Sequence, residues 1–313
     1  MGLCKQKKGT KSKQYECDDF LHNLVQRYNF FLIYEKKVVI LQHMKHIRIL
    51  SPSGVIAPEL ILQAQKRLES WGYCVSIGQY AMEQYGRFAG TATQRLSDLN
   101  EALADPSIDI ILCSRGGYGL QQILDQIVLP TRPKEEWPLI VGYSDITELH
   151  SLMSLHGVKS LHMSMCKDLS ELADDNPTLI AMREALDGKT QKLLDENQKV
   201  IGGNLSVLYG LQGTPWDLNH IIDNMDSSPI LLIEDIAETH YHIDRMLNNL
   251  RMSGVLSRIS GLIVGHFTDC KEDERMGCSI PQTIQQAVSE YNYPIIWGAP
   301  IGHEEPNLPM MLG

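Results

Sequence analysis

From residue 45 onward the chain repeats one pattern: a short apolar run, a turn containing Gly or Pro, and then a segment with helical spacing. In the first repeat the apolar run covers 47–50 and the turn covers 51–54. The helical segment that follows has apolar side chains at Leu60, Ile61, Ala64, Leu68 and Trp71. Strands that alternate with amphipathic helices assemble into a parallel sheet whose faces the helices cover. The sequence therefore predicts an α/β protein.

Further apolar runs predict more strands and a second domain. The runs at 73–77, 108–113 and 139–143 belong to the first domain, and the run at 108–113 lacks strict alternation, as a central parallel strand does. Thr93 is predicted to cap the helix that follows it, and another helix is expected after the glycines at 116–119. Residues 171–199 are polar and charged, which predicts a connection between domains at 45–170 and 200–313.

The second domain repeats the pattern with apolar runs that predict strands at 230–233, 261–265 and 294–297. Helical spacing predicts helices at 240–252 and 281–291. Residues 1–44 do not follow this rhythm, and five of their first thirteen residues are lysines, which is typical of a solvated tail. The segment is either an N-terminal extension of unknown role or the product of a misassigned start, and the sequence leaves both open.

Composition excludes several classes of protein. The net charge of −10 disfavours nucleic acid as a partner, because a phosphate-binding surface needs clustered Lys and Arg. No apolar stretch approaches the roughly 18 residues that a membrane helix needs. The seven cysteines are scattered and form no Cys-x-x-Cys pair, so neither a disulfide framework nor a zinc site is indicated. With no export signal evident, we expect reduced thiols and a cytoplasmic protein.

Ser144 lies where the buried strand at 139–143 meets a helix. This is the geometry of a nucleophile elbow, in which a tight turn presents the hydroxyl and backbone N–H groups at the helix start hold an oxyanion. The second Gly of the usual Gly-x-Ser-x-Gly motif is absent, because Ile146 takes its place. The alternative is that Ser144 or Asp145 only caps the helix.

A glycine-rich loop, Arg115-Gly116-Gly117-Tyr118-Gly119, follows the strand at 108–113. Its glycines permit positive φ and close approach of the backbone, which suits an oxyanion hole or a phosphate cradle. The spacing is not that of a dinucleotide-binding fingerprint, and no Gly-Lys-Ser/Thr follows.

Two acids, Glu234 and Asp235, end the apolar strand that begins at residue 230, and His303 lies on a glycine-rich loop after the last predicted strand. Strand-end acids commonly solvate a loop or cap the next helix; alternatively, one of them orients a histidine in a Ser-His-acid set. His240 and His242 lie on a predicted helix, where residues two apart point in different directions, so a metal site is not indicated.

Together these motifs and others in the same order make the chain from about residue 46 to residue 313 resemble the LD-carboxypeptidase family, which includes muramoyltetrapeptide carboxypeptidases and microcin C resistance peptidases. The segments that carry the resemblance are Ser51-Pro52-Ser53, Phe88-Ala89-Gly90-Thr91, Arg95, Asp98-Leu99-Asn100, Ala104-Asp105-Pro106, Arg115-Gly116-Gly117-Tyr118-Gly119, Gly142-Tyr143-Ser144-Asp145-Ile146-Thr147, Gly202-Gly203-Asn204-Leu205, Gly213-Thr214-Pro215, Ile233-Glu234-Asp235, Asp244-Arg245-Met246-Leu247 and Pro300-Ile301-Gly302-His303.

The resemblance implies a flavodoxin-like, parallel-sheet N-terminal domain, a smaller β-rich C-terminal domain and a homodimer. It also implies that Ser144 is the nucleophile, Glu234 the acid and His303 the base of a serine carboxypeptidase that needs no metal or organic cofactor. We expect N–H groups of Asp145 and Gly117 to hold the oxyanion. Arg115 is expected either to recognise the terminal carboxylate of a substrate or to fix the loop by pairing with an acid.

The substrate implied by the resemblance is a murein tetrapeptide that loses its terminal D-Ala during cytoplasmic cell-wall recycling. The rivals are a related peptidase acting on a peptidyl-nucleotide antibiotic or an acylated amino acid, and a non-catalytic binding protein of the same fold. The sequence does not distinguish lysine from diaminopimelate as the third stem residue. It departs from the family in two places: His162-Met163-Ser164 stands where relatives often have His-Gly-Pro, and the sequence ends at Gly313 where relatives usually continue through a further strand or two.

Overall fold

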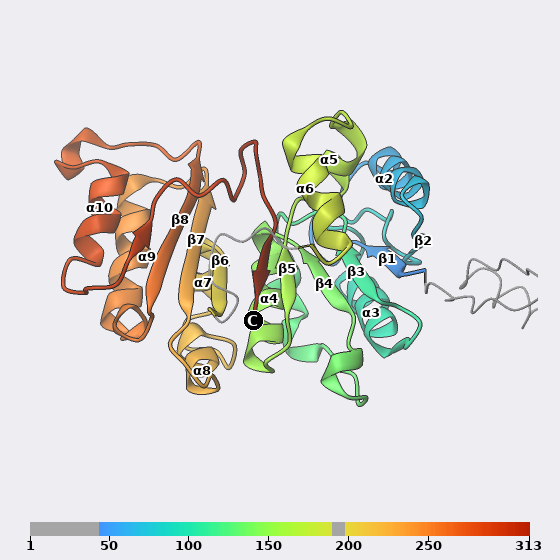
Figure 1. Ribbon diagram of the computed structural model, residues 1–313, viewed down its shortest axis with the longest axis horizontal. Helices are drawn as coiled ribbons and strands as arrows, with labels where there is room; N and C mark the ends of the chain where they lie inside the picture. Colours follow the sequence, from blue (N-terminus) through green and yellow to red (C-terminus); the bar gives the residue numbers. More distant parts are fainter. Residues whose placement is uncertain (1–43, 190–197) are drawn as a thin grey trace, which may run out of the picture.

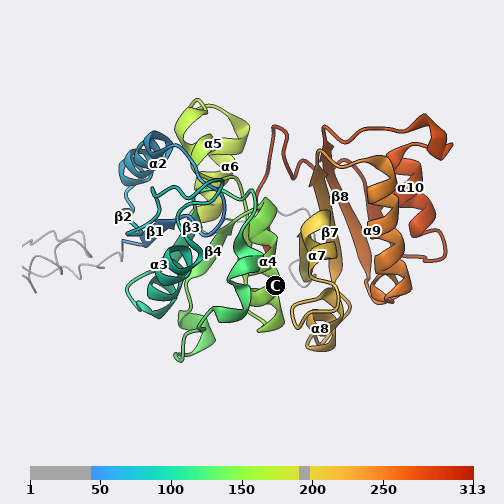
Figure 2. The same ribbon diagram turned by 180° about the vertical axis from the view of Figure 1, so that it is seen from behind.

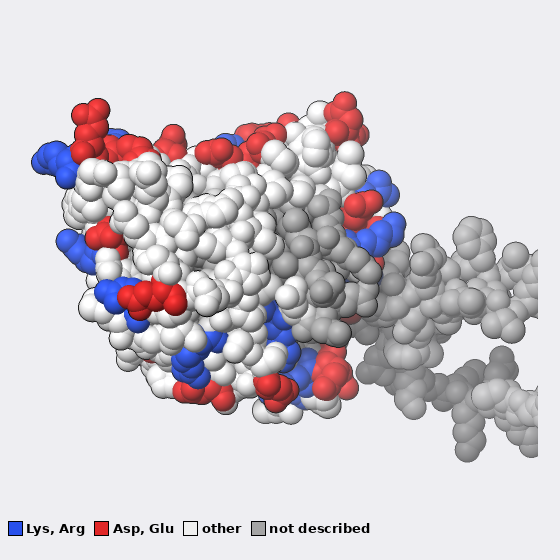
Figure 3. Space-filling model, turned by 60° about the vertical axis from the view of Figure 1, so that its left-hand side comes forward, with Lys and Arg blue, Asp and Glu red and all other residues white. Residues whose placement is uncertain are grey.

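The computed structural model describes residues 44–189 and 198–313, so the segment predicted as an extension, 1–44, lies outside them apart from Met44. Two sheets form the centres of two domains that lie side by side (Figure 1). Within the described part of the chain, no helix combines the length and the apolar character that a bilayer span requires. On the face shown in Figure 3, acidic and basic side chains lie mostly around the edge and leave the centre uncharged.

The first domain is built on a six-stranded sheet with the strand order β10-β5-β4-β3-β1-β2. Its strands are β1 (His46–Leu50), β2 (Cys74–Ile77), β3 (Ile110–Cys113), β4 (Leu139–Gly142), β5 (Ser160–His162) and β10 (Met310–Leu312). All neighbours pair in parallel except β10, which pairs antiparallel with β5. The parallel α/β architecture predicted for this domain is confirmed.

Helices cover both faces of this sheet, as the apolar character of β3 predicts. They are α2 (Pro58–Ser70), α3 (Ala92–Ala104), α4 (Thr147–Leu155), α5 (Cys166–Glu171) and α6 (Pro177–Leu186). Helices α2, α5 and α6 pack against Ile110 and Leu112, whereas α3 and α4 share a second core with Ile111 and Cys113. All four β3 side chains are buried, so the strand is central and covered on both faces.

Three local predictions for the first domain differ from the structure. Helix α3 begins after Thr91, whose hydroxyl accepts a hydrogen bond from Gln94 N in a capping box, so Thr93 is not the cap. Two short 3₁₀ turns, Leu120–Gln122 and Leu124–Gln126, stand where a helix was expected after the glycine loop. Helix α6 lies inside the predicted connection at 171–199, yet its apolar face joins the core of the first domain. The polar residues at 174–176 precede the helix, and those at 195–197 lie outside the described residues.

The second domain has a four-stranded parallel sheet with the order β6-β7-β8-β9. Its elements are β6 (Val200–Asn204), α7 (Leu205–Gly210), α8 (Leu218–Asp223), β7 (Ile230–Ile236), α9 (His240–Met252), β8 (Gly261–Thr268), α10 (Ile280–Ala287) and β9 (Ile295–Ile296). All four helices pack on one face of the sheet and enclose an apolar core. The domain is thus a smaller α/β unit in which every strand runs parallel.

The other face of the second sheet is covered by the C-terminal segment of the chain. Ala299, Ile301, Met310 and Leu312 pack against Val200, Ile230, Leu232 and Ile263. The backbone of the same segment adds β10 to the first sheet, where Met310 pairs with His162. Helix α4 of the first domain also packs against β6 and α7, and the view from behind shows α4 on the side of its domain that faces α7 (Figure 2). The C-terminal strand therefore joins the two domains.

Candidate active site

Ser144 lies at the turn between β4 and α4, and its backbone is strained. Its φ is +65°, and among the described residues only Ala237 and Asp269 share a positive φ without being glycine. The left-handed conformation costs a residue with a Cβ roughly 1–2 kcal/mol, and such strain persists where the surroundings enforce it. The structure therefore has the strained strand-to-helix turn that a nucleophile elbow requires.

The Asp145 side chain holds the elbow in place. Its buried carboxylate accepts hydrogen bonds from Ser53 Oγ at 2.6 Å and from Leu120 N at 3.0 Å. Neither Ser144 nor Asp145 makes a side-chain cap to α4 or to the 3₁₀ turn before it. The capping alternative is therefore wrong, because Asp145 joins the elbow to two neighbouring loops.

The glycine-rich loop packs directly on the elbow. A Cβ built on Gly116 would lie 2.8 Å from Ser144 Cβ and 3.1 Å from Asp145 N, so only glycine fits there. Gly117, with φ +98°, lies instead against Gly54. The fully buried Arg95 donates to Gly119 O at 2.7 Å, which fixes the end of the loop. Of the loop's glycines, Gly116 is the one whose backbone approaches Ser144.

Glu234 and His303 meet in the second domain. Glu234 lies on β7 with no exposed surface, and its Oε2 is 2.7 Å from His303 Nδ1. An ionised carboxylate can only accept, so Nδ1 carries the proton of this bond and Nε2 is left as the acceptor. A Cβ on Gly302 would lie 3.1 Å from Glu234 Oε2, so the glycine before His303 leaves room for the carboxylate.

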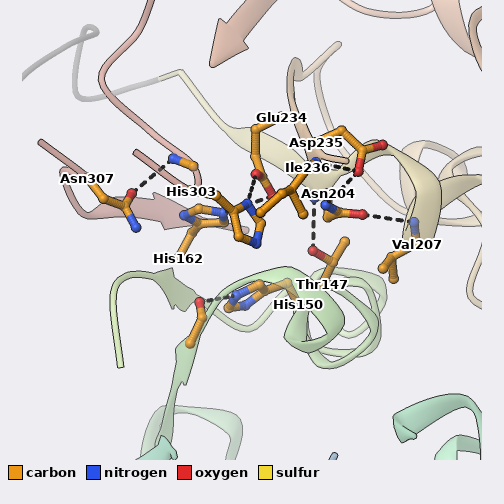
Figure 4. A network of polar contacts seen from close by, with 12 residues as sticks. Thr147, His150, His162, Asn204, Val207, Glu234, Asp235, Ile236, His303 and Asn307 are labelled. Atoms are coloured by element: carbon orange, nitrogen blue, oxygen red, sulfur yellow. Dashed lines mark hydrogen bonds and ion pairs between the residues drawn. The ribbon is translucent and has the colours of Figure 1, made fainter. Parts of the chain in front are cut away.

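A second histidine, His162, lies beside the same carboxylate; it was named from the sequence in His162-Met163-Ser164 but was given no role in the site. It ends β5, is fully buried, and its Nε2 is 3.9 Å from Glu234 Oε1 (Figure 4). Burial alone would raise the pKa of Glu234, but the contacts with His162 and His303 outweigh it and hold that pKa well below its usual range. Glu234 is therefore a carboxylate at neutral pH.

The Tyr143 ring brings the elbow and this histidine pair together. Its centroid is 4.7 Å from that of His303 and 5.7 Å from that of His162. Tyr143 directly precedes Ser144 in the chain. The structure thus places His303, from the C-terminal segment, next to the elbow of the first domain.

Asp235 faces away from His303, as expected for neighbours on a strand. Its carboxylate accepts from Asn204 Nδ2 at 3.0 Å and from Ser206 N at 2.9 Å. Asn204 N in turn donates to Thr147 Oγ1 at 3.0 Å, which is a contact between the domains (Figure 4). Of the two strand-end acids, only Glu234 contacts a histidine of the site.

A cavity of about 760 Å³ opens beside His303, and both domains line it. Its wall includes Tyr143, Lys167, Asp168 and Glu304 as well as Arg115. Arg115 Nη1 donates to Val55 O at 2.6 Å, so the guanidinium both fixes a loop and borders the cavity. Arg115 forms no ion pair with an acid among the described residues, so its structural contact is a hydrogen bond to a backbone carbonyl and not the expected pairing with an acid.

Comparisons with known proteins match both domains of the chain. Residues 47–163 match the family model for the LD-carboxypeptidase N-terminal domain, and residues 198–313 match that for the LD-carboxypeptidase C-terminal domain. A Bacillus subtilis protein named probable murein peptide carboxypeptidase is 30% identical, with 85% of this chain and 86% of the relative aligned.

Two solved structures are similar in fold. The muramoyltetrapeptide carboxypeptidase from Oxalobacter formigenes is 27% identical with a TM-score of 0.72, covering 86% of this chain and 93% of that one. The microcin C7 self immunity protein MccF, in complex with aspartyl sulfamoyl adenosine, has a TM-score of 0.70 at 19% identity, covering 87% and 92%. At that identity the second likeness concerns the fold alone.

Proposed function

The chain belongs to the LD-carboxypeptidase family, and we propose that it is a serine peptidase that releases the terminal D-Ala of a murein tetrapeptide. The observation that carries the proposal is the Glu234–His303 hydrogen bond of 2.7 Å beside a serine with φ +65°. A buried carboxylate that orients a histidine next to a strained serine is the arrangement of a Ser-His-acid set. The names of the relatives support the choice of substrate.

In the proposed mechanism His303 Nε2 takes the proton of the Ser144 hydroxyl as the oxygen attacks the carbonyl of the terminal peptide bond. Glu234 stays ionised and stabilises the imidazolium that forms. His303 then gives the proton to the leaving amine of D-Ala, and water hydrolyses the acyl-enzyme by the same steps in reverse. The mechanism uses no metal and no organic cofactor.

The developing oxyanion needs N–H donors next to Ser144. We assign this role to the N–H of Asp145, at the start of the turn, and to an N–H of the glycine loop, with Gly117 as the predicted donor. The packing of Gly116 on Ser144 supports a contribution from this loop, because it brings the loop backbone to the elbow. Each donor in such a site is worth about 10²–10³ in kcat.

We also propose that Arg115 recognises the carboxylate of the terminal D-amino acid. It borders the same cavity as His303 and Tyr143, and a guanidinium matches a carboxylate in two-pronged fashion. We further propose that the enzyme is a cytoplasmic homodimer that acts in cell-wall recycling. Light scattering of the purified protein at assay concentration measures the dimer directly.

The proposal is tested with a panel of purified peptides. L-Ala-γ-D-Glu-X-D-Ala, with X either L-Lys or diaminopimelate, is compared with the same peptides ending in L-Ala, and the released amino acid is identified by chiral chromatography. We expect D-Ala from the LD peptides and little L-Ala from their LL counterparts. Equal hydrolysis of LD and LL peptides, or cleavage of an aminoacyl sulfamoyl adenosine in place of both, would reject the assignment.

A further inference from the structure

Asn307 is a buried amide that contacts both domains, and neither the sequence motifs nor the proposed mechanism gives it a role. Only 3% of its surface is exposed. Its Oδ1 accepts from Gly302 N at 3.0 Å, and its Nδ2 donates to Ser164 Oγ at 2.9 Å. Its backbone N donates to Thr178 Oγ1 at 3.0 Å. Three hydrogen-bonding groups of one residue are therefore satisfied inside the protein.

These contacts close the loop that carries His303. Gly302 precedes His303 directly, and Asn307 lies five residues after Gly302, so the side-chain amide fastens the start of the loop to its end (Figure 4). The bond from Leu308 N to Pro300 O, at 2.7 Å, closes the same loop at its base. The backbone on either side of His303 is thus held by hydrogen bonds.

The outer contacts of Asn307 go to the first domain. Ser164 follows β5, Thr178 lies in the first turn of α6, and both are fully buried. Glu234, by contrast, fixes the ring of His303 from the second domain. The ring is therefore oriented from one domain, while its backbone is fastened to the domain that holds Ser144.

We propose that Asn307 is a positioning residue that, through Ser164, sets the place of His303 relative to Ser144. This inference rests on the proposed function. Proton transfer requires a serine and histidine within about 2.6–3.2 Å, and displacement of a reacting group by ~1 Å costs about 10² in rate. Asn307 also borders the cavity beside His303, but its side-chain amide acts on that distance through Gly302 and Ser164.

The partner of Asn307 in the first domain, Ser164, lies in a segment that departs from the family pattern. Ser164 is the third residue of His162-Met163-Ser164, which stands where relatives often have His-Gly-Pro. A proline there has no hydroxyl to accept from Asn307 Nδ2. The Ser164 hydroxyl therefore links this segment by a hydrogen bond to the loop that carries His303.

A double-mutant cycle tests the proposal, with Ser164→Ala, Asn307→Ala and the double variant measured for kcat, KM and thermal stability. We expect each single variant to lower kcat about tenfold to a hundredfold with KM within about threefold, and the double variant to be no worse than Asn307→Ala, because coupled residues are not additive. Ser164→Thr, which keeps the hydroxyl, is expected to retain most of the wild-type kcat.

Ile284→Val, in the core of the second domain, is the stability control because it removes about 0.5–1.5 kcal/mol without touching the site. The rate at which a fluorophosphonate labels Ser144 is measured for every variant and reports the serine–histidine pair without any peptide. If Asn307→Ala and Ser164→Ala lose stability like Ile284→Val but keep kcat and labelling within twofold of wild type, the positioning role is rejected. If Asn307→Ala does not fold, the Ser164→Ala and Ser164→Thr pair decides the question alone.

The outcome separates this inference from the proposed function. Failure of wild-type protein to release D-Ala, with normal labelling of Ser144, rejects the substrate and leaves the positioning role testable by labelling. Normal D-Ala release with unaffected Ser164 and Asn307 variants rejects the positioning role and leaves the function intact.

Discussion

Replacing Gly116 by alanine should lower the activity, because the new side chain would collide with the turn that carries Ser144. The new Cβ would lie 2.8 Å from Ser144 Cβ and 2.9 Å from Tyr143 O. Ordinary van der Waals contact begins near 3.4 Å, so the loop or the elbow must move by about 0.6 Å. Neither neighbour is the free end of a flexible side chain, since one is a backbone oxygen and the other is the first atom of a side chain on a strained backbone.

A displacement of that size should slow the reaction and destabilise the fold. If ~1 Å costs about 10² in rate, a shift of about 0.6 Å should lower kcat/KM by about tenfold to a hundredfold. Overpacking of this kind costs about 1–3 kcal/mol of the free energy of unfolding. Steady-state kinetics with the LD tetrapeptide measure the first effect, and urea unfolding followed by circular dichroism measures the second.

The control is Gly210→Ala at the end of α7, where the new Cβ would meet only Gln121 Nε2 at 3.7 Å. That variant should keep full activity and should not lose stability, because alanine favours a helix over glycine by about 0.8–1.0 kcal/mol. If Gly116→Ala keeps kcat/KM within twofold of wild type, the glycine loop does not constrain Ser144 and the argument fails.

Three further predictions concern the charged groups of the site. Glu234→Gln should lower kcat by about 10⁴, whereas Asp235→Asn should lower stability more than kcat; the reverse order in a kinetic comparison would exchange the two roles. Arg115→Lys should raise KM for the free-acid peptide and leave the poor turnover of its C-terminal amide unchanged, and equal losses on both peptides would leave Arg115 as a structural residue. The pKa of Glu234 is depressed in the folded state, so its stabilising contribution is present above the unfolded pKa of about 4.3 and is lost as pH falls through the folded pKa. The difference in Tm between wild type and Glu234→Gln should therefore shrink from pH 6 toward pH 3, and a constant difference in a pH series of melts would reject the depressed pKa.

Much of the fold could be predicted because its signals are local. The apolar run at 108–113 became the fully buried strand β3, and the helix expected at 240–252 is α9, His240–Met252. Helix α6 was predicted as part of a connection, because polar residues precede it at 174–176 and its apolar face has a partner only in the folded core. Periodicity reports which residues are apolar but does not report which distant element will cover them.

The residues of the candidate site also differ in how well the sequence predicts them. Ser144 and Glu234 lie at the ends of apolar strands, where the sequence marks them, and the resemblance supplied their roles together with that of His303. His162 and Asn307 were given no role in the site, because their importance depends on contacts between segments far apart in the chain: His162 with Glu234, and Asn307 with Ser164. For His162 the usable signal was a histidine at the end of the strand next to β4; for Asn307 there was none.

The central claim is that Ser144 is the nucleophile, and the most direct measurement is the release of D-Ala from the LD tetrapeptide by Ser144→Ala. Alanine tolerates the same φ as poorly as serine does, so the Tm should change little. Loss of one member of such a set typically costs about 10⁴–10⁶ in kcat, and we predict a fall of that size in a folded protein. Activity above a tenth of wild type, in a preparation free of other peptidases, would contradict the account.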